Sequence, residues 1–223
     1  MKIKVTGDKK EFILVIPEDL VIKGNVDLSD MGLTELPDLS AVTVNGDFDC
    51  GSNKLTSLQG APQRVFGSFI CSNNKLKSLN GVQRAFDGNF DCSKNELTTL
   101  EGAPICVIDD FICSNNKLTS LQGAPESVGG DFDCRDNKLT SLQGAPESVG
   151  GCFDCSGNKL KSLAGAPQKV GGNFDCFRNK SLMSLNGVSQ EIGGKFICDN
   201  KYLQEYKEIQ LARFAAKQGQ RQK

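Results

Sequence analysis

The chain has 223 residues, enough for one large domain or two small ones, and its 38% hydrophobic and 24% charged residues are an ordinary soluble composition. A formal net charge of −1 excludes a whole-molecule electrostatic attraction to nucleic acid or membranes, so an electrostatic function must come from how charge is distributed. The chain contains no histidine, which excludes Ser-His-Asp and Cys-His catalytic sites.

Residues 1–24 lie outside the repeat that fills most of the chain. The segments KIKV and EFILVI stand on either side of TGDKK, and this pattern predicts a β-hairpin. A hairpin there would cover the open core edge of a repeat structure, so we expect an N-terminal cap. The segment is charged too early and too often for a signal peptide, and no stretch has the length of a membrane span. We therefore expect a cytoplasmic protein.

Residues 25–201 contain a repeat of 21 residues. One position of the unit is a cysteine in eight successive copies, separated by 21 residues except for the last step, which is 22. Leu28 continues the series upstream, so nine rungs are visible. A fixed period of about 20 to 29 residues is the signature of a solenoid, in which similar coils stack on one another. The cysteines of this column are Cys50, Cys71, Cys92, Cys113, Cys134, Cys155, Cys176 and Cys198.

Each column of the repeat has a physical role. A phenylalanine lies two residues before each of these cysteines, and the strand period of two places both side chains on one inward face. An asparagine lies three residues after the cysteine in seven copies, where its amide can donate and accept hydrogen bonds with the backbone of adjacent coils. Gly-Ala-Pro and Gly-Gly supply the turns. The unit therefore predicts stacked short strands around a core of phenylalanine, cysteine and leucine.

Residues 202–223 predict a C-terminal capping helix and a frayed tail. Tyr202, Tyr206, Ile209 and Phe214 follow one another at helical spacing. This remainder of about twenty residues is too short for an independent catalytic domain. We expect the protein not to be an enzyme.

The motifs FDCRDNKL, FDCSGNKL and FICSNNKL match the pattern L-x-L-x-x-N-x-L of the leucine-rich repeat family, with Phe and Cys in place of the usual leucines. From about residue 25 to 206 the chain resembles the short bacterial and bacteriophage members of this family. The resemblance implies a fold of the α/β repeat class that is predominantly β, a solenoid with a curved parallel sheet, here between the hairpin cap and the helical cap. It also implies binding of a protein partner through the concave face and, for a bacteriophage protein, a place in the host cytoplasm.

The cysteines allow more than one interpretation. Cys152 and Cys155 have the CxxC spacing of redox and zinc motifs, but two residues three apart in a strand face opposite sides. A column of cysteines in a cytoplasmic chain is better explained by small buried hydrophobic residues than by disulfides. The Val-Gly-Gly segments beside aspartates are similar to those of calcium-binding coils, whose period is nine residues rather than 21. We expect no cofactor and no metal site.

The outward position between phenylalanine and cysteine is aspartate in six of nine rungs. Aspartate is uncommon in strands, and like charges on adjacent strands are destabilising, so this choice needs compensation. All predicted outward positions around the strands hold four bases and twelve acids, a net charge of 4 − 12 = −8. The rest of the chain has 22 bases and 15 acids, a net charge of +7. We expect an acidic concave face and a basic outer surface, built largely from Lys54, Lys75, Lys117, Lys138, Lys159 and Lys180.

Three explanations of the acidic stripe remain open. The charges can keep a long sheet soluble and separate from other sheets. They can form a binding surface for a basic partner, with exposed apolar groups as anchors. The run of Asp133, Asp154 and Asp175 can also bind a divalent cation weakly. The candidate partner-binding residues are Asp49, Ile70, Asp91, Ile112, Asp131, Asp133, Asp154, Asp175, Phe177, Arg178 and Ile197.

The sequence thus predicts a non-enzymatic scaffold whose acidic sheet captures a basic protein surface. One concrete form is a phage or bacterial inhibitor that covers the nucleic-acid-binding face of a host enzyme or defence protein. The alternatives are an effector or adaptor that recruits a substrate to an enzyme, and a structural repeat protein with weak divalent-cation binding. We do not expect a nucleic acid partner, because the lysines lack interleaved aromatic residues, and we expect no membrane partner.

Overall fold

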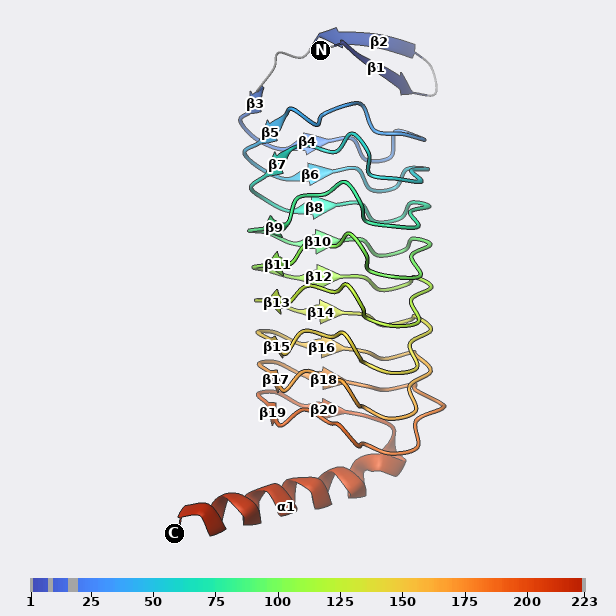
Figure 1. Cartoon of the computed structure of the whole chain (residues 1–223). Helices are drawn as coiled ribbons and strands as arrows, with labels where there is room; N and C mark the ends of the chain where they lie inside the picture. Colours follow the sequence, from blue (N-terminus) through green and yellow to red (C-terminus); the bar gives the residue numbers. More distant parts are fainter. Residues whose placement is uncertain (1, 8–9, 16–19, 222–223) are drawn as a thin grey trace.

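The computed structural model describes residues 2–7, 10–15 and 20–221. Most of them form a parallel β-solenoid whose coils stack in one column (Figure 1). Its C-terminal end is a short 3-10 helix, η1 (Asn200–Tyr202), followed by the α-helix α1 (Leu203–Arg221). The predicted solenoid is confirmed, but each coil has two short strands where the repeat predicts one.

The first stack of strands is a nine-stranded sheet at the phenylalanine positions. In-register pairing places each of these residues beside its equivalent in the next coil, as Phe111 lies beside Phe132. The strands are β4 (Val26–Asp27), β6 (Phe48–Asp49), β8 (Phe69–Ile70), β10 (Phe90–Asp91), β12 (Phe111–Ile112), β14 (Phe132–Asp133), β16 (Phe153–Asp154), β18 (Phe174–Asp175) and β20 (Phe196–Ile197).

The second stack lies just before the turn that leads into the first, and its second residue points inward. Three strands pair at the N-terminal end, namely β3 (Val21–Ile22), β5 (Thr43–Val44) and β7 (Arg64–Val65). Six more continue along the solenoid, namely β9 (Ala85–Phe86), β11 (Cys106–Val107), β13 (Ser127–Val128), β15 (Ser148–Val149), β17 (Lys169–Val170) and β19 (Glu191–Ile192).

An antiparallel hairpin forms at the N-terminus, as predicted, from β1 (Lys2–Gly7) and β2 (Lys10–Val15). Part of the TGDKK loop, residues 8–9, lies outside the described residues. Coil-to-coil pairing begins at Val21, within the range 1–24 that we assigned to the cap. That the hairpin covers the first coil stays a prediction.

The core is a continuous stack of aromatic rings beside a column of thiols. Ring centroids of successive coils, from Phe48 to Phe196, are 5.2–5.7 Å apart. The cysteines of the repeat column from Cys50 to Cys176, which excludes Cys106 and Cys152, are fully buried, and all ten cysteines of the chain are free. Burial raises the pKa of the buried thiols, so they remain protonated and behave as small apolar side chains.

Asparagine side chains form a ladder through the solenoid, which confirms the predicted role of this column. Asn116 Nδ2 donates to the carbonyl oxygens of Cys92 and Cys113 at 3.0 and 3.1 Å, and Oδ1 accepts from the Leu97 N–H at 3.0 Å. One amide therefore satisfies the buried Leu97 N–H and shares two buried carbonyls, of Cys92 and Cys113, with the asparagines of the neighbouring coils. The ladder consists of Asn53, Asn74, Asn95, Asn116, Asn137, Asn158 and Asn179.

At the C-terminal end, α1 takes the place of a further coil. The Tyr206 ring stacks on Phe196 with centroids 4.1 Å apart, where the next phenylalanine would lie. The Glu205 carboxylate accepts the Leu185 N–H at 2.7 Å, a donor that a further coil would otherwise satisfy. The helix thus supplies both the apolar and the polar contacts of a missing coil.

On the opposite face of α1, the side chains of Leu211 and Phe214 are exposed. Arg213, on the capping face, donates to the carbonyl oxygens of Val188 and Ser189 at 2.9 and 2.7 Å. Phe214 is 64% exposed, so the predicted capping role is wrong for this residue, because its neighbour in sequence already occupies the inward direction.

Among the helices of the described residues, none is long and apolar enough to cross a membrane.

The asparagine ladder predicts a large loss of stability on Asn116→Ala. This change leaves the buried Leu97 N–H without a partner and removes one of two donors from the Cys92 and Cys113 carbonyls, so we expect the free energy of unfolding to fall by about 2 kcal/mol. Chemical denaturation measures the change. Asn115→Gly is the matched control, because Asn115 is exposed and its φ of 56° suits glycine, so it should change stability little. Equal losses in both variants would contradict the ladder.

The burial of the thiols predicts two classes of cysteine in the native protein. Cys106 and Cys152 are partly exposed, and the other eight are buried. We expect a thiol reagent to modify about two groups quickly and the rest only on unfolding. Replacing both residues, Cys106→Ser and Cys152→Ser, should abolish the fast phase. Fast reaction of additional thiols in that variant would show that the core is more open than described.

Candidate protein-binding surface

The outward side chains of the nine-stranded sheet form one surface, which we call the Asp face. In-register pairing places Asp133, Asp154 and Asp175 side by side on β14, β16 and β18. Ile70 and Ile112 are each flanked by aspartates of the neighbouring coils. The predicted alternation, with phenylalanine inward and this position outward, is confirmed. The Asp face comprises Asp27, Asp49, Ile70, Asp91, Ile112, Asp133, Asp154, Asp175 and Ile197.

Each aspartate of the Asp face also closes a turn at the end of its strand. Asp154 Oδ1 accepts the Ser156 N–H at 2.9 Å, and Asp175 Oδ1 accepts the Phe177 N–H at 2.8 Å. This contact to the residue two positions on is an Asx turn, for which aspartate and asparagine are both suited. It explains an acceptor at this position but not a negative charge. The same bond is made by Asp27, Asp49, Asp91 and Asp133.

The charges of the Asp face are only partly compensated. Arg135 Nε lies 3.4 Å from Asp133 Oδ2, and its Nη1 lies 3.7 Å from Asp154 Oδ2. Burial nevertheless raises the pKa of Asp133 above its usual value, although the Arg135 N–H and guanidinium act in the opposite direction. Burial also raises the pKa of Asp175, and the nearby Asp154 charge adds to this effect. The charged forms of these two carboxylates therefore oppose folding at neutral pH.

Apolar side chains interrupt the charge. Phe177 is 44% exposed and Ile197 is 36% exposed, whereas Ile70 and Ile112 are half-buried. Phe177 lies two residues after the end of β18, and exposed Arg178 follows it with a φ of 60°, so both lie at the strand-end edge of the Asp face. The surface therefore combines apolar groups with surrounding carboxylates.

Asp131 does not lie on the Asp face but at a corner of the coil, just before β14. Its Oδ1 accepts the Cys152 N–H at 2.6 Å, and its own N–H donates to Asp110 Oδ1 at 2.7 Å. Asp47 Oδ1 makes the equivalent bond with the Ser68 N–H. The expected net charge of −8 on one face therefore included carboxylates that serve this corner.

These contacts form a second ladder, which the sequence analysis missed and which we call the corner ladder. The residue before each phenylalanine accepts the N–H of its equivalent in the next coil, and a glycine precedes it in most copies. A Cβ at Gly151 would lie 2.2 Å from Asp131 Oδ1, so the ladder leaves no room for a side chain there. The signal in the sequence is a column with an acceptor in each copy. The corner ladder comprises Asn25, Asp47, Ser68, Asn89, Asp110, Asp131, Cys152 and Asn173.

The two sulfurs of the CxxC segment have different surroundings. Cys152 Sγ accepts the Asn173 N–H at 3.3 Å in the corner ladder and is partly exposed, whereas Cys155 is fully buried in the core column. Within residues 20–221, His, Cys, Asp and Glu side chains form no group of three or more that could hold a metal ion.

These features define a parallel β-solenoid of 21-residue coils with a charged strand face, and such coils fit the leucine-rich repeat resemblance. No family model and no curated protein matches the chain. Among solved structures, YopM from Yersinia enterocolitica WA-314 is similar, with a TM-score of 0.43 and 20% identity. The match covers 78% of this chain and 55% of that chain, so the chain spans about half the length of that protein.

The electrostatic cost of the Asp face predicts a pH-dependent gain on removal of its charge. A group whose pKa is raised by folding favours the folded state below its ordinary pKa of about 3.9 and loses this contribution as pH rises through the folded pKa. The double variant Asp133→Asn and Asp175→Asn keeps the turn acceptors and removes the charges. We expect a melting temperature about 2–4 °C higher than wild type at pH 7.

The difference between this variant and the wild type should vanish near pH 3, which thermal scans across the pH range measure. The corresponding alanine variant lacks the turn acceptors as well and serves as the comparison. A gain that is constant with pH would show that the carboxylate charges do not cause it.

Proposed function

We propose that the protein is a non-enzymatic protein-binding scaffold whose Asp face captures a basic protein surface. The supporting observation is the choice of aspartate, never asparagine, at six positions where the turn needs only an acceptor. An asparagine would close the same turn without a charge. It would therefore avoid the cost of partly burying a carboxylate, which the raised pKa values of Asp133 and Asp175 indicate. At Asp133 and Asp175 the charge therefore costs stability that the turn does not require, and recognition of a partner of opposite charge accounts for it.

The apolar side chains of the Asp face support a protein partner rather than a small ion. Protein interfaces combine a buried apolar centre with a polar rim. Ile112 lies between Asp91 and Asp133 in the sheet, and exposed Phe177 follows Asp175. A contact of this kind does not require the sheet to be curved.

A concrete form of this function is an inhibitor of a protein that acts on nucleic acid. Carboxylates on adjacent parallel strands are spaced by about 4.8 Å, so they present a row of negative charge to a surface that otherwise binds phosphates. A bacterial or bacteriophage origin and a cytoplasmic site of action belong to this form of the proposal, with a host enzyme or defence protein as the target.

The proposal predicts that the charge of the Asp face, rather than net charge, determines binding. We use core histones as the basic protein probe and measure their binding to the immobilised chain. The variant with Asp133→Asn, Asp154→Asn and Asp175→Asn should bind at least about tenfold more weakly, because three charges leave the contact while the turn acceptors stay. A control with Glu101→Gln, Glu126→Gln and Glu147→Gln makes the same change of charge at exposed positions off the Asp face.

A second arm tests the apolar part of the surface. Ile112→Thr keeps the charge and a β-branched side chain, so we expect weaker binding at unchanged salt dependence. Equal effects of the Asp face and control variants would mean that only net charge matters. Circular dichroism confirms that each variant remains folded.

A further inference from the structure

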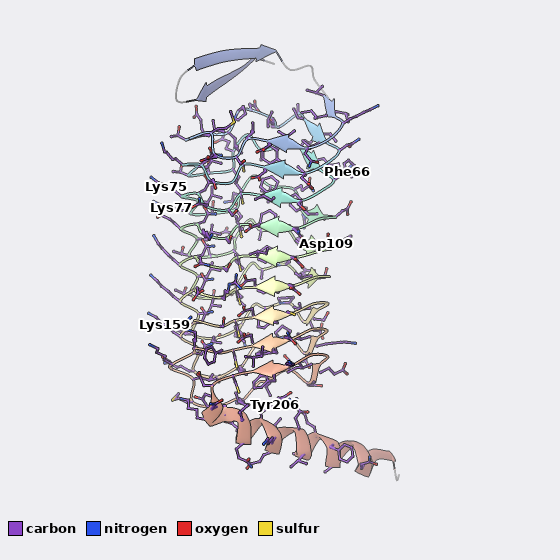
Figure 2. All side chains as sticks on the ribbon, turned by 180° about the vertical axis from the view of Figure 1, so that it is seen from behind. Phe66, Lys75, Lys77, Asp109, Lys159 and Tyr206 are labelled. Carbon is purple, nitrogen blue, oxygen red and sulfur yellow. The ribbon has the colours of Figure 1, made fainter. Side chains whose placement is uncertain are left out.

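A second charged surface lies on another side of each coil, and we call it the Lys–Thr stripe. It consists of the outward positions four and six residues after the cysteine column, on either side of a buried leucine such as Leu76 or Leu118. Figure 2 shows Lys75, Lys77 and Lys159 on the same side of the stack. The stripe holds Lys54, Lys75, Lys77, Lys117, Lys138, Lys159, Lys161 and Lys180 with Thr56, Thr98, Thr119 and Thr140, all of them exposed.

The backbone holds the lysines of the stripe in a regular row. The Lys75 N–H donates to the Leu55 carbonyl oxygen at 2.9 Å, and the Lys138 N–H donates to that of Leu118 at 2.8 Å. Because successive coils are about 4.8 Å apart, the row from Lys54 to Lys180 is about 29 Å long. The stripe is therefore long, narrow and regular.

The positive charge of the stripe is almost unopposed. Glu96 is the one acid in these two columns, so eight lysines and one glutamate give a formal charge of +7. In the part of the chain that the structure describes, Lys117 is the one lysine of the stripe with an acidic partner, Glu96 at 3.2 Å. Lysines in adjacent coils repel each other, and the fold does not compensate this repulsion. A partner of opposite charge would relieve it.

We propose that the Lys–Thr stripe docks the phosphate backbone of duplex nucleic acid without reading its sequence. Lysine ammonium groups and threonine hydroxyls are among the groups that contact phosphate oxygens in such complexes. A length of about 29 Å approaches one turn of duplex, about 34 Å. The Asp face is a separate surface, and charges further away than about 8 Å are largely screened at physiological ionic strength.

The stripe contains no aromatic residues, and this favours a duplex over a single strand as its partner. Single strands are held largely by bases stacked on aromatic side chains, whereas duplex binding without sequence preference needs phosphate contacts alone. The sequence led us to expect no nucleic acid partner of any kind, but its ground, the missing aromatic residues, bears on single strands and not on duplexes. An anionic membrane is a broad surface, which a row two residues wide fits less well than a linear polymer.

The test is fluorescence anisotropy of a labelled DNA duplex of about 20 base pairs, two helical turns, titrated with the full chain. We expect dissociation constants of about 10⁻⁴ to 10⁻⁶ M near physiological salt, with affinity falling steeply as salt rises. The variant with Lys117→Gln, Lys138→Gln and Lys159→Gln should lose about tenfold in affinity and about three units of the logarithmic salt slope. The control Lys169→Gln, Lys195→Gln and Lys207→Gln removes three exposed lysines outside the stripe.

Several outcomes would overturn the proposal. They are no binding at low salt, equal losses in the stripe and control variants, or tighter binding to a single strand, to polyphosphate or to vesicles rich in phosphatidylserine. Affinity that is insensitive to duplex sequence, and lost only in the stripe variant, supports it. Because histone capture depends on the Asp face, failure here leaves the proposed function intact.

Discussion

The structure depends on one constraint. The backbone N–H and C=O groups of each coil must pair with those of the next coil, so neighbouring coils are held one strand spacing apart. Two-residue strands provide few of these bonds, so side chains supply the others. The Asn116 side chain bonds to backbone groups of two coils inside the core, and Asp131 performs a related task at the outer corner. The same spacing explains the stacked rings, the buried thiols and the glycine pairs. When identical coils stack closely, a position accepts only a residue that does not clash with its equivalent in the next coil.

The same constraint also repeats every outward-facing residue type along the solenoid. A residue type that recurs once per coil forms a row at strand spacing, so a modest local preference becomes an extended charged surface. Aspartate does so on the nine-stranded sheet and lysine on the stripe beside the leucines. The molecule has a net charge of only −1, yet it presents surfaces of opposite sign. Net charge therefore says little about which partners such a protein can attract.

Much of this architecture follows from the sequence, because burial and hydrogen-bonding needs leave regular marks in a repeat. The inward phenylalanine and cysteine, and the asparagine ladder, were predicted from spacing alone. The acceptor role of Asp131 is not predicted, because its column varies among Asn, Asp, Ser and Cys and shows no single residue type. The second strand at Ser127–Val128 is also missed, because two residues next to a Gly-Gly turn are too few to show a strand period. The Asx turns of the Asp face were also missed, because we interpreted the aspartate column only as surface charge and did not consider a hydrogen bond to the residue two positions on. Phe214 was assigned to the capping face because helical spacing alone does not determine which way a helix is turned.

Because α1 supplies the contacts of a further coil, it also protects the C-terminal end of the solenoid from association with other chains at high concentration. Exposed ends of stacked parallel strands are templates on which another chain can add, and this is how fibrils grow. Tyr206 occupies the position of the next ring, and Glu205 satisfies the donor that an incoming strand would use. A chain shortened before Leu203 would expose this template, and purified protein of that kind should be prone to fibrous aggregation while the intact molecule stays dispersed.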